Sequence, residues 1–273
     1  MKLAYLGTPE MAVPPLDALV AAGHDLRVVV TRADARRGRG GRTAPSPVKA
    51  AAEHHGIAVT HDVDDLVPLA ERGEVELGVV VAYGRIIRPH VLAALPMVNL
   101  HFSLLPRWRG AAPVERAILA GDEVTGVCLM EVEEGLDTGG VYGRVDVPIG
   151  RTDADGLRAT LVDVGVDLLV DRLANGRAGL GEPVPQRGAV THAAKVTADE
   201  LRIDWARPAV EIERLVRLGE AWTTFRGRRL KVLAAEILDG RLVPTVVRPE
   251  GKPAMDYEAW RNGARPAPGE WFE

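Results

Sequence analysis

The sequence predicts an α/β fold: a doubly wound, mostly parallel sheet followed by a small β-rich domain. Apolar strand-like runs alternate with helical segments over residues 1–175, the pattern of a parallel sheet with helices on both faces. A stretch rich in glycine and proline follows at 175–190. Short strand-like segments come after it. We therefore expect domains at 1–180 and 196–273, joined by a linker at 181–195.

The strands of the first domain are short apolar runs. Residues 26–31 form a continuous β-branched run, typical of a strand that is buried on both faces. The expected strands are residues 2–6, 26–31, 57–60, 77–82, 98–101, 125–132 and 141–147.

Capping residues mark the helices between these strands. Ser46 is a candidate N-cap with Pro47 in the first turn, and Gly23 and Gly56 are candidate helix stops. The expected helices are residues 14–22, 47–55, 64–72, 112–120 and 155–173. Residues 32–45 show no periodicity and are predicted to be a loop.

The second domain is predicted from one helix and a hairpin. The helix is expected at 208–218, and Gly227 separates two strand-like segments at 222–226 and 229–235. A third strand is expected at 241–247, before a tail rich in proline and glycine.

Composition and charge narrow the classes of function. The chain has 34 Lys and Arg against 38 Asp and Glu, a net charge of −4, which disfavours extensive coating of nucleic acid. Cys128 is the single cysteine, which excludes an internal disulfide and a thiolate metal cluster. No apolar run approaches the ~18 residues that span a bilayer, and the N-terminal segment is too short for a signal peptide. We expect a cytoplasmic protein without metal or membrane contact.

A local excess of positive charge interrupts this mild acidity. With only Asp34 opposing them, five arginines lie close together: Arg32, Arg36, Arg37, Arg39 and Arg42. Arginine neutralises phosphates, and the glycines between these residues let a backbone approach closely. A solvated loop is the competing interpretation, and it is the commoner one for an arbitrary Arg/Gly tract.

The most informative stretch is N-L-H-F-S-L-L-P-R-W-R-G-A-A-P at 99–113. Asn99 and His101 alternate on a strand, so their side chains share one face. They lie at the carboxyl end of that strand, where doubly wound folds bind their ligands. An amide beside an imidazole suits oxyanion stabilisation and proton transfer. A histidine at a strand end is more often a structural residue whose hydrogen bonds are satisfied within the protein.

Other loops at strand ends give weaker signals. Gly7-Thr8-Pro9 lacks the G-x-G-x-x-G pattern of dinucleotide sites, and no G-x-x-x-x-G-K-[ST] loop occurs. Asp137 lies in G-L-D-T-G-G at 135–140, which is either part of a site or a bare turn. V-V-A-Y-G at 80–84 either lines a slot for a flat heterocycle or simply ends a strand.

Together these segments resemble the methionyl-tRNA formyltransferase family. The shared motifs are G-T-P-E-M-A at 7–12, P-S-P-V-K at 45–49, V-A-Y-G at 81–84, N-L-H-F-S-L-L-P-R-W-R-G-A-A-P at 99–113 and G-L-D-T-G at 135–139. Their order and spacing match over about residues 1–205. Related enzymes that formylate sugar amines or glycinamide ribonucleotide share the Asn–His–Asp trio, but the intact P-S-P-V-K favours the tRNA branch.

The resemblance implies a Rossmann-like formyltransferase catalytic domain and a C-terminal domain that is an abbreviated OB-like barrel. It implies transfer of a formyl group from 10-formyltetrahydrofolate to the amino group of methionyl initiator tRNA, in translation initiation. The residues that match the catalytic trio are Asn99, His101 and Asp137. The Asn99 amide and a protonated His101 would stabilise the tetrahedral oxyanion. Asp137 would favour the imidazolium and help to take the proton that the amine loses.

The resemblance also assigns binding residues, with no metal. The tract of arginines corresponds to a family segment that inserts toward the acceptor end of the tRNA, and the residues expected to bind it are Arg36, Arg37, Arg39 and Arg42. The residues expected to bind the folate are Val81, Ala82, Tyr83, Gly84, Ser103, Leu104, Leu105, Pro106, Leu136, Thr138 and Gly139. A monomer is the default expectation.

Three departures from the family pattern leave alternatives open. Phe102 stands where a small residue is usual, which predicts a reshaped pocket, and Gly140 stands where an acidic residue is frequent. The C-terminal domain lacks an N-P-W-P segment and, between Asp239 and Arg248, one or two strands. One alternative is a formyltransferase that acts on an amino sugar or another small primary amine. Another is a catalytically silent RNA- or folate-binding paralogue.

Overall fold

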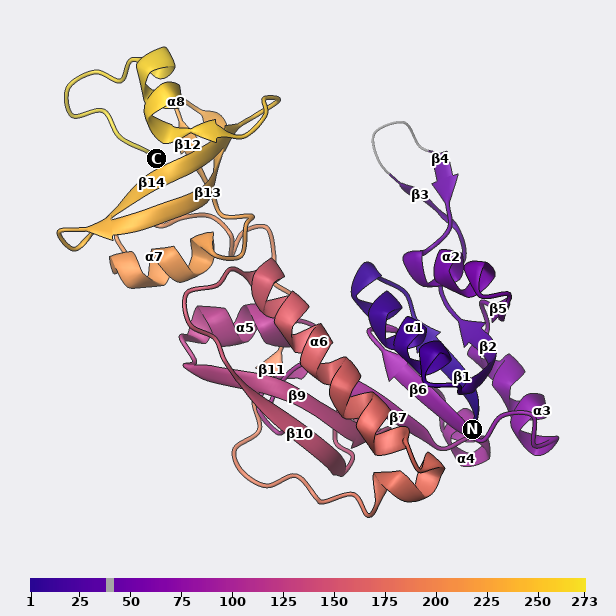
Figure 1. Ribbon diagram of the computed structural model, residues 1–273. Helices are drawn as coiled ribbons and strands as arrows, with labels where there is room; N and C mark the ends of the chain where they lie inside the picture. The colour runs from indigo at the N-terminus through magenta and orange to yellow at the C-terminus, as the bar shows by residue number, and fades with distance from the viewer. Residues whose placement is uncertain (38–41) are drawn as a thin grey trace. The chain divides into compact units, whose positions relative to one another are not determined.

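The computed structural model describes residues 1–37 and 42–273 (Figure 1). These residues divide into two compact units, each described here by itself. Unit 1 comprises Met1–Ala111, Thr125–Pro148 and Arg158–His192. Unit 2 comprises Ala112–Val124, Ile149–Leu157 and Ala193–Glu273.

Unit 1 is built on a seven-stranded sheet in the order β10-β9-β7-β6-β1-β2-β5. The pairs β5-β2, β2-β1, β1-β6 and β6-β7 are parallel, whereas β9 is antiparallel to β7. The strands are β1 (Lys2–Gly7), β2 (Asp25–Val30), β5 (Ala58–Thr60), β6 (Leu77–Val81), β7 (Met97–His101), β9 (Val124–Glu131) and β10 (Val141–Pro148). The predicted mostly parallel sheet is confirmed.

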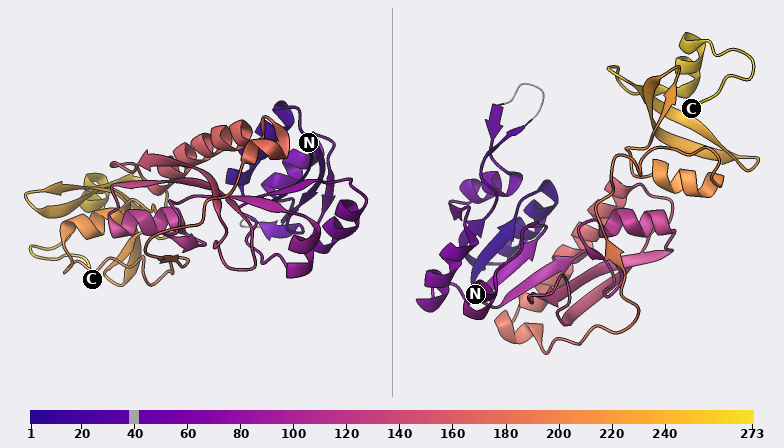
Figure 2. Two further views of the ribbon diagram at one scale, coloured as in Figure 1. Left: turned by 90° about the horizontal axis from the view of Figure 1, so that it is seen from below. Right: turned by 180° about the vertical axis from the view of Figure 1, so that it is seen from behind.

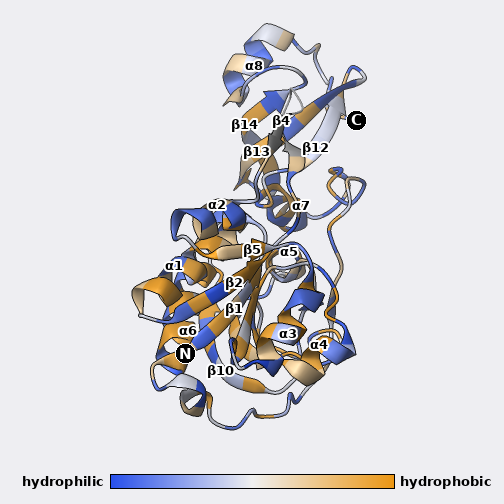
Figure 3. Ribbon diagram, turned by 90° about the vertical axis from the view of Figure 1, so that its right-hand side faces the viewer, coloured by the Kyte–Doolittle hydropathy of each residue, from blue (hydrophilic) through white to orange (hydrophobic). Residues whose placement is uncertain are grey.

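Helices cover both faces of this sheet. Figure 3 shows α1 and α6 on one side of the strands and α3 and α4 on the other, and Figure 2 shows the indigo and purple strands flanked by helices. The helices are α1 (Val13–Ala21), α2 (Pro47–His54), α3 (Leu66–Glu71), α4 (Pro89–Ala94) and α6 (Ala154–Leu173), with short 3-10 turns at Glu10–Ala12, Val63–Asp65 and Gly176–Leu180. Of these, α4 was not expected from the sequence.

Strand β1 shows why the sheet needs two helical layers. Its even-numbered residues Ala4 and Leu6 pack in a cluster with Leu66 of α3. Its odd-numbered residues Leu3 and Tyr5 are fully buried as well. Since alternate residues of a strand face opposite sides, both faces of β1 are covered, as its continuous apolar run predicts.

The segment predicted to be a loop at 32–45 is partly a hairpin. The antiparallel strands β3 (Ala35–Arg37) and β4 (Arg42–Ala44) pair Arg36 with Thr43. The expectation of an irregular loop was therefore wrong for these residues, because tertiary pairing overrides weak local propensity. Arg39, predicted to bind tRNA, lies outside the described residues.

Unit 2 contains an antiparallel sheet in the order β12-β13-β14-β15. Ile212 and Val216 of its amphipathic helix α7 pack against Val232 of β13. Its elements are α5 (Pro113–Ala120), α7 (Ala209–Val216), β12 (Trp222–Phe225), β13 (Arg228–Leu238), β14 (Arg241–Pro249), β15 (Met255–Asp256) and α8 (Tyr257–Ala264). A small β-rich C-terminal sheet was predicted; β15 and α8 were not expected.

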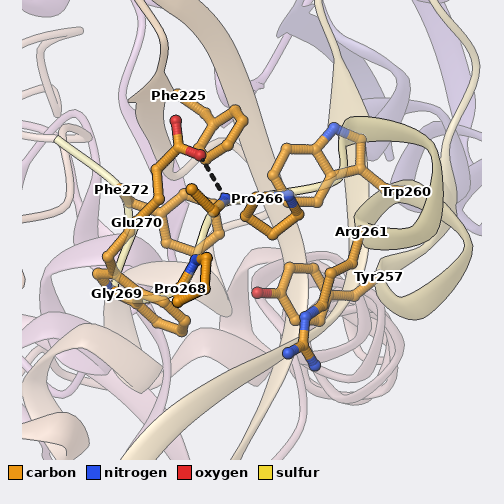
Figure 4. A pocket seen from close by; sticks show the side chains of 11 residues that line it. Phe225, Tyr257, Trp260, Arg261, Pro266, Pro268, Gly269, Glu270 and Phe272 are labelled. Carbon is orange, nitrogen blue, oxygen red and sulfur yellow. Dashed lines mark hydrogen bonds between the residues drawn. The ribbon is translucent and has the colours of Figure 1, made fainter.

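The end of the chain closes unit 2 with aromatic rings. Trp260 meets Phe225 edge to face with ring centroids 5.1 Å apart, and Trp205 stacks on Phe272 at 5.0 Å. Figure 4 shows the rings of Phe225, Tyr257, Trp260 and Phe272 lining a pocket. The volume of this pocket is about 440 Å³. The packing of these rings makes the C-terminal tail part of the core of this unit.

Among the described residues, no helix combines the length and apolar character that crossing a bilayer requires.

Candidate active site

The candidate site lies at the carboxyl end of β7, within unit 1. Asn99 and His101 are two residues apart on this strand, so both side chains project from one face. The neighbouring parallel strand β6 ends at Val81. Gly7 ends β1 beside it, and a Cβ atom on Gly7 would lie 2.9 Å from the carbonyl oxygen of Val81. These neighbouring strand ends form the edge where doubly wound sheets bind ligands.

The ring of His101 is held at both nitrogens. Its side chain is only 6% exposed, and Nε2 lies 2.9 Å from the carbonyl oxygen of Trp108. A carbonyl oxygen only accepts hydrogen bonds, so Nε2 carries the hydrogen of the neutral ring. Nδ1 then faces the carboxylate of Asp137, with 3.6 Å between Nδ1 and Oδ2. His101 is therefore oriented toward Asp137 by a backbone contact on its other side.

Asp137 reaches His101 from the loop between β9 and β10. Its backbone has φ = 51°, in the left-handed region, where Asp is tolerated better than most side chains. The Gly110 N–H donates to its Oδ2 at 2.8 Å. A Cβ atom on Gly139 would lie 2.1 Å from the carbonyl oxygen of Glu131, so only glycine fits there. The glycines around Asp137 thus serve close backbone packing and are not merely turn residues.

Asn99 contributes an amide without a protein partner. The residue is partly buried, and its side chain makes no hydrogen bond within the described part of the chain. An amide in this state can donate to an oxygen of a bound molecule at little cost in existing contacts. The structure thus brings all three residues of the predicted trio to one strand end and its facing loop.

The loop after β7 is fixed by its own hydrogen bonds. Ser103 is fully buried, and its hydroxyl donates to the carbonyl oxygen of Arg107 at 2.6 Å. Trp108 adopts φ = 63°, and its N–H donates to the Thr191 hydroxyl at 2.8 Å. The short strands β8 (Arg109–Gly110) and β11 (His192–Ala193) pair here. This loop presents the two backbone groups that hold His101 and Asp137.

The residues predicted to bind folate separate into surface and core positions. Ala82, Gly84, Leu104 and Thr138 keep part of their surface accessible, and Leu136 is 65% exposed. The side chains of the others are buried by the protein itself: Val81, Tyr83, Ser103, Leu105 and Pro106, as is the backbone of Gly139. The side chains of the buried members are thus part of the core, and only the accessible members have surface that a ligand could cover.

The two departures near the site have structural explanations. Phe102 is buried, and a Cβ atom on Gly165 of α6 would lie 3.8 Å from its ring. The ring thus packs against α6 together with Leu100, and its effect on the shape of the pocket stays a prediction. Gly140 lies against Pro183, where a Cβ atom would come within 2.7 Å of the proline side chain. A side chain at position 140 would displace the segment that passes over it.

Two other candidate chemistries receive no support. Among the described residues, no three His, Cys, Asp or Glu side chains are placed to hold a metal ion. Cys128 is a buried thiol, and burial raises its pKa to about 11. A thiol with this pKa is almost entirely protonated at neutral pH and is a poor nucleophile.

Three groups that touch the trio were not identified from the sequence. They are the Trp108 carbonyl, the Gly110 N–H and the Gln186 side chain, whose amide donates to the carbonyl oxygens of Asp137 and Gly139. Backbone groups leave no residue-type signal. Gln186 was overlooked because it lies in the segment whose composition predicts a linker. Its one signal is that it is the single glutamine of the chain.

The arginines predicted to bind RNA lie on other strands or outside the described residues. Arg36 and Arg37 lie on β3 and Arg42 lies on β4. Their role stays a prediction.

Comparison with known proteins defines the class. The family model "Formyl transferase" matches residues 1–173, and "Formyl transferase, C-terminal domain" matches residues 195–243. The fold and these matches together define the class of the protein as a formyl transferase. A methionyl-tRNA formyltransferase from Dinoroseobacter shibae is 46% identical over 252 residues, which cover 88% of this chain and 84% of that protein. The chain belongs to the methionyl-tRNA formyltransferase family.

Solved structures show the same fold at low identity. Methionyl-tRNA formyltransferase from Clostridium thermocellum has a TM-score of 0.65 and 16% identity, and the match covers 91% of this chain and 98% of that one. HypX from Aquifex aeolicus in complex with tetrahydrofolic acid has a TM-score of 0.67 and 17% identity. That match covers 96% of this chain but 47% of HypX, so this chain spans about half the length of HypX.

Proposed function

We propose that the chain transfers a formyl group from 10-formyltetrahydrofolate to the amino group of methionyl-tRNA, a step of translation initiation. The observation that carries the proposal is the meeting of His101 and Asp137 beside the unpartnered amide of Asn99, in a chain of this family. The new bond joins the amine nitrogen to the formyl carbon, and the bond from that carbon to the donor nitrogen breaks. The amine loses one proton and the donor nitrogen gains one.

Asn99 and His101 act on the oxygen of the formyl group. Attack by the amine places negative charge on that oxygen, and preorganised donors at this point lower the barrier. The Asn99 amide is free to donate because it has no partner within the described residues. Because His101 Nε2–H is engaged by Trp108, the second donor is Nδ1 of the protonated ring.

Asp137 acts on the proton. Its Oδ2 lies 3.6 Å from His101 Nδ1, too far for a hydrogen bond in this state but close enough to attract an imidazolium. The Gly110 N–H keeps this oxygen aimed at the ring. The carboxylate is thus placed to stabilise a charged His101 and to receive a proton released by the amine.

The accessible members of the folate set support binding of a flat, partly apolar donor. Leu136 adjoins Asp137 and exposes 65% of its surface, which a ring can cover. Ala82 has φ = 49° and Gly84 has φ = 71°, so the loop after β6 turns sharply, and both residues keep accessible surface that a heterocycle could cover. A neighbour of the same fold is described in complex with tetrahydrofolic acid, which agrees with a folate donor.

The acceptor follows from the family and from the tract of arginines. Arg36, Arg37 and Arg42 belong to a hairpin, and Arg39 to the segment between its strands. We propose that these four side chains neutralise phosphates of the tRNA acceptor end. A cytoplasmic location and a monomeric state stay predictions.

A formylation assay tests the function. The purified chain is supplied with 10-formyltetrahydrofolate and, in separate reactions, with methionyl initiator tRNA or an amino-sugar nucleotide. We expect turnover of the tRNA, and binding that weakens steeply with salt. Turnover of the amino sugar alone, with binding that is nearly independent of salt, would instead assign the small-amine alternative. No formyl transfer to either acceptor would leave a silent binding protein.

A further inference from the structure

We propose that Gln186 is a positioning residue, whose amide fixes the Asp137 loop against the loop that holds His101. The inference rests on the proposed function, because that function gives Asp137 and His101 their catalytic roles. Gln186 lies outside both loops, in the segment at 183–191, and its hydrogen bonds reach neither the ring of His101 nor the carboxylate of Asp137. It acts on the Asp137 loop through backbone carbonyl groups, and on the loop after β7 through the side chain of Arg109.

One end of the Gln186 side chain holds the Asp137 loop. Its Nε2 donates to the carbonyl oxygen of Asp137 at 2.8 Å and to that of Gly139 at 2.8 Å. A side-chain amide has two N–H donors, so both are used on this one loop. The two carbonyl groups flank Thr138, and their common donor fixes the turn that aims the Asp137 carboxylate.

The other end of the same side chain holds the loop after β7. Arg109 donates to Gln186 Oε1 from Nε at 3.1 Å and from its terminal nitrogen Nη2 at 2.6 Å. Arg109 lies between Trp108 and Gly110 in the sequence. The Trp108 carbonyl accepts from His101, and the Gly110 N–H donates to Asp137. A single side chain thus joins the two loops through four hydrogen bonds.

Both loops need such support because of their backbone conformations. Asp137 has φ = 51° and Trp108 has φ = 63°, left-handed values that side chains other than glycine adopt at a cost in free energy. Residues in such conformations persist only where the surroundings hold them, and they cluster at functional sites. Here the hydrogen bonds of Gln186 and Arg109 are part of what holds these two conformations.

The path of the segment aims Gln186 at this point. Val184 exchanges both backbone hydrogen bonds with Val141 of β10, at 2.8 and 2.9 Å. Thr191 accepts from the N–H groups of Trp108 and Arg109. Anchored at both ends, the segment passes over Gly140, whose missing side chain leaves room for Pro183. The stretch that its composition marks as a linker is therefore tied to the site.

Two substitutions separate the halves of this arrangement. Gln186→Glu keeps the length of the side chain and an acceptor for Arg109, but it removes both donors to the Asp137 loop. Gln186→Ala removes both the donors to the Asp137 loop and the acceptor for Arg109.

We expect each variant to lower kcat for formylation by between about tenfold and a hundredfold, the effect of misplacing a reacting group slightly. KM for both substrates and the melting temperature should stay near those of the unmodified chain. Glu182→Gln, an exposed substitution in the same stretch, is the matched control with unchanged kcat.

A spectroscopic measurement reads the hydrogen bonds without any substrate. Because Gln186 is the only glutamine, labelling glutamine with ¹⁵N at the side chain yields one amide group in the spectrum of the full chain. We expect its two protons to exchange with solvent much more slowly than those of free glutamine. Arg109→Lys removes the fork that holds the other end and should speed this exchange.

The outcomes distinguish the two claims. If the unmodified chain formylates neither acceptor, the proposed function is wrong, whereas the exchange measurement still reports on the loops. If the Gln186 amide exchanges as fast as free glutamine, or if both variants keep their kcat, the positioning role is wrong. A fall in melting temperature that accounts for the whole loss of activity would likewise reduce Gln186 to a structural residue.

Discussion

His101 Nδ1 faces Asp137 Oδ2 at 3.6 Å, while Nε2 of the same ring is bonded to the Trp108 carbonyl. Strand β7 supplies the imidazole, and the loop between β9 and β10 supplies the carboxylate. The ring therefore has one fixed nitrogen and one that is available for protonation beside a negative charge.

Asn99 is predicted to contribute to the chemical step and little to binding. Asn99→Ala should lower kcat by about 10²–10³-fold, the usual effect of removing one oxyanion donor. Asn175→Ala is the matched control, because that residue is exposed and its side chain caps no helix. Single-turnover formylation measures both. An Asn99→Ala protein as active as the control would remove Asn99 from the mechanism.

The arginines of the hairpin are predicted to govern the salt dependence of tRNA binding. Replacing Arg36, Arg37 and Arg42 by glutamine removes three cations. The slope of log K against log salt concentration should become shallower by about 2, since each phosphate contact contributes about 0.7–0.9. Arg72→Gln, an exposed arginine that pairs with Glu74, serves as the control. An unchanged slope in the triple variant would show that this hairpin does not bind phosphates.

Unit 2 is predicted to lose stability at acidic pH through Glu200. The Arg116 guanidinium, together with the N–H of Thr197, lowers the pKa of Glu200 from 4.5 to about 2. A carboxylate with a depressed pKa in the folded state stabilises that state above its ordinary pKa and loses the effect as pH falls toward 2. The melting temperature of Glu200→Gln should therefore lie below that of the unmodified chain at pH 7, and the difference should vanish near pH 2. The contribution is modest because the Glu200 side chain is 41% exposed.

The control for this experiment is Asp199→Asn, an exposed neighbouring acid. It should leave the pH dependence of melting unchanged. A difference between Glu200→Gln and the unmodified chain that is constant from pH 7 to pH 2 would contradict the assigned ion pair.

The thiol of Cys128 is predicted to be inert in the folded chain. Burial raises its pKa to about 11, and it packs with Leu105 and Met130. An aromatic disulfide reagent should therefore react negligibly at pH 8 and should titrate one thiol per chain once denaturant is added. Rapid reaction without denaturant would mean that the strand β9 opens readily beside the site.

Local pattern predicted the sheet because each strand carries its own signal. The apolar run at 26–31 and the alternation of Asn99 and His101 are properties of single strands, and both predictions agree with the structure. The β3–β4 hairpin was missed because each of its strands is only three residues long and carries mostly arginine and alanine, without apolar alternation. α8 was missed because proline and glycine dominate the tail that follows it.

The site was predicted less completely, for a physical reason. Asn99 and His101 were singled out from their strand, and the resemblance joined Asp137 to them, but the groups that hold His101 and Asp137 are the Trp108 carbonyl and the Gly110 N–H. Every residue has such groups, so only a folded chain shows which of them point at the site. Phe102 shows the same limit: its size suggested a changed pocket, and only the folded chain shows that its ring is buried against α6 near Gly165.

The most direct measurement is single-turnover formylation of methionyl-tRNA by Asp137→Asn. The asparagine is nearly the same size and can still accept from Gly110, but it carries no charge and cannot accept a proton. We predict a loss of about 10²–10⁴-fold in the rate, with tRNA binding and melting temperature unchanged. A variant that formylates at the rate of the unmodified chain would contradict the assigned partnership of His101 and Asp137.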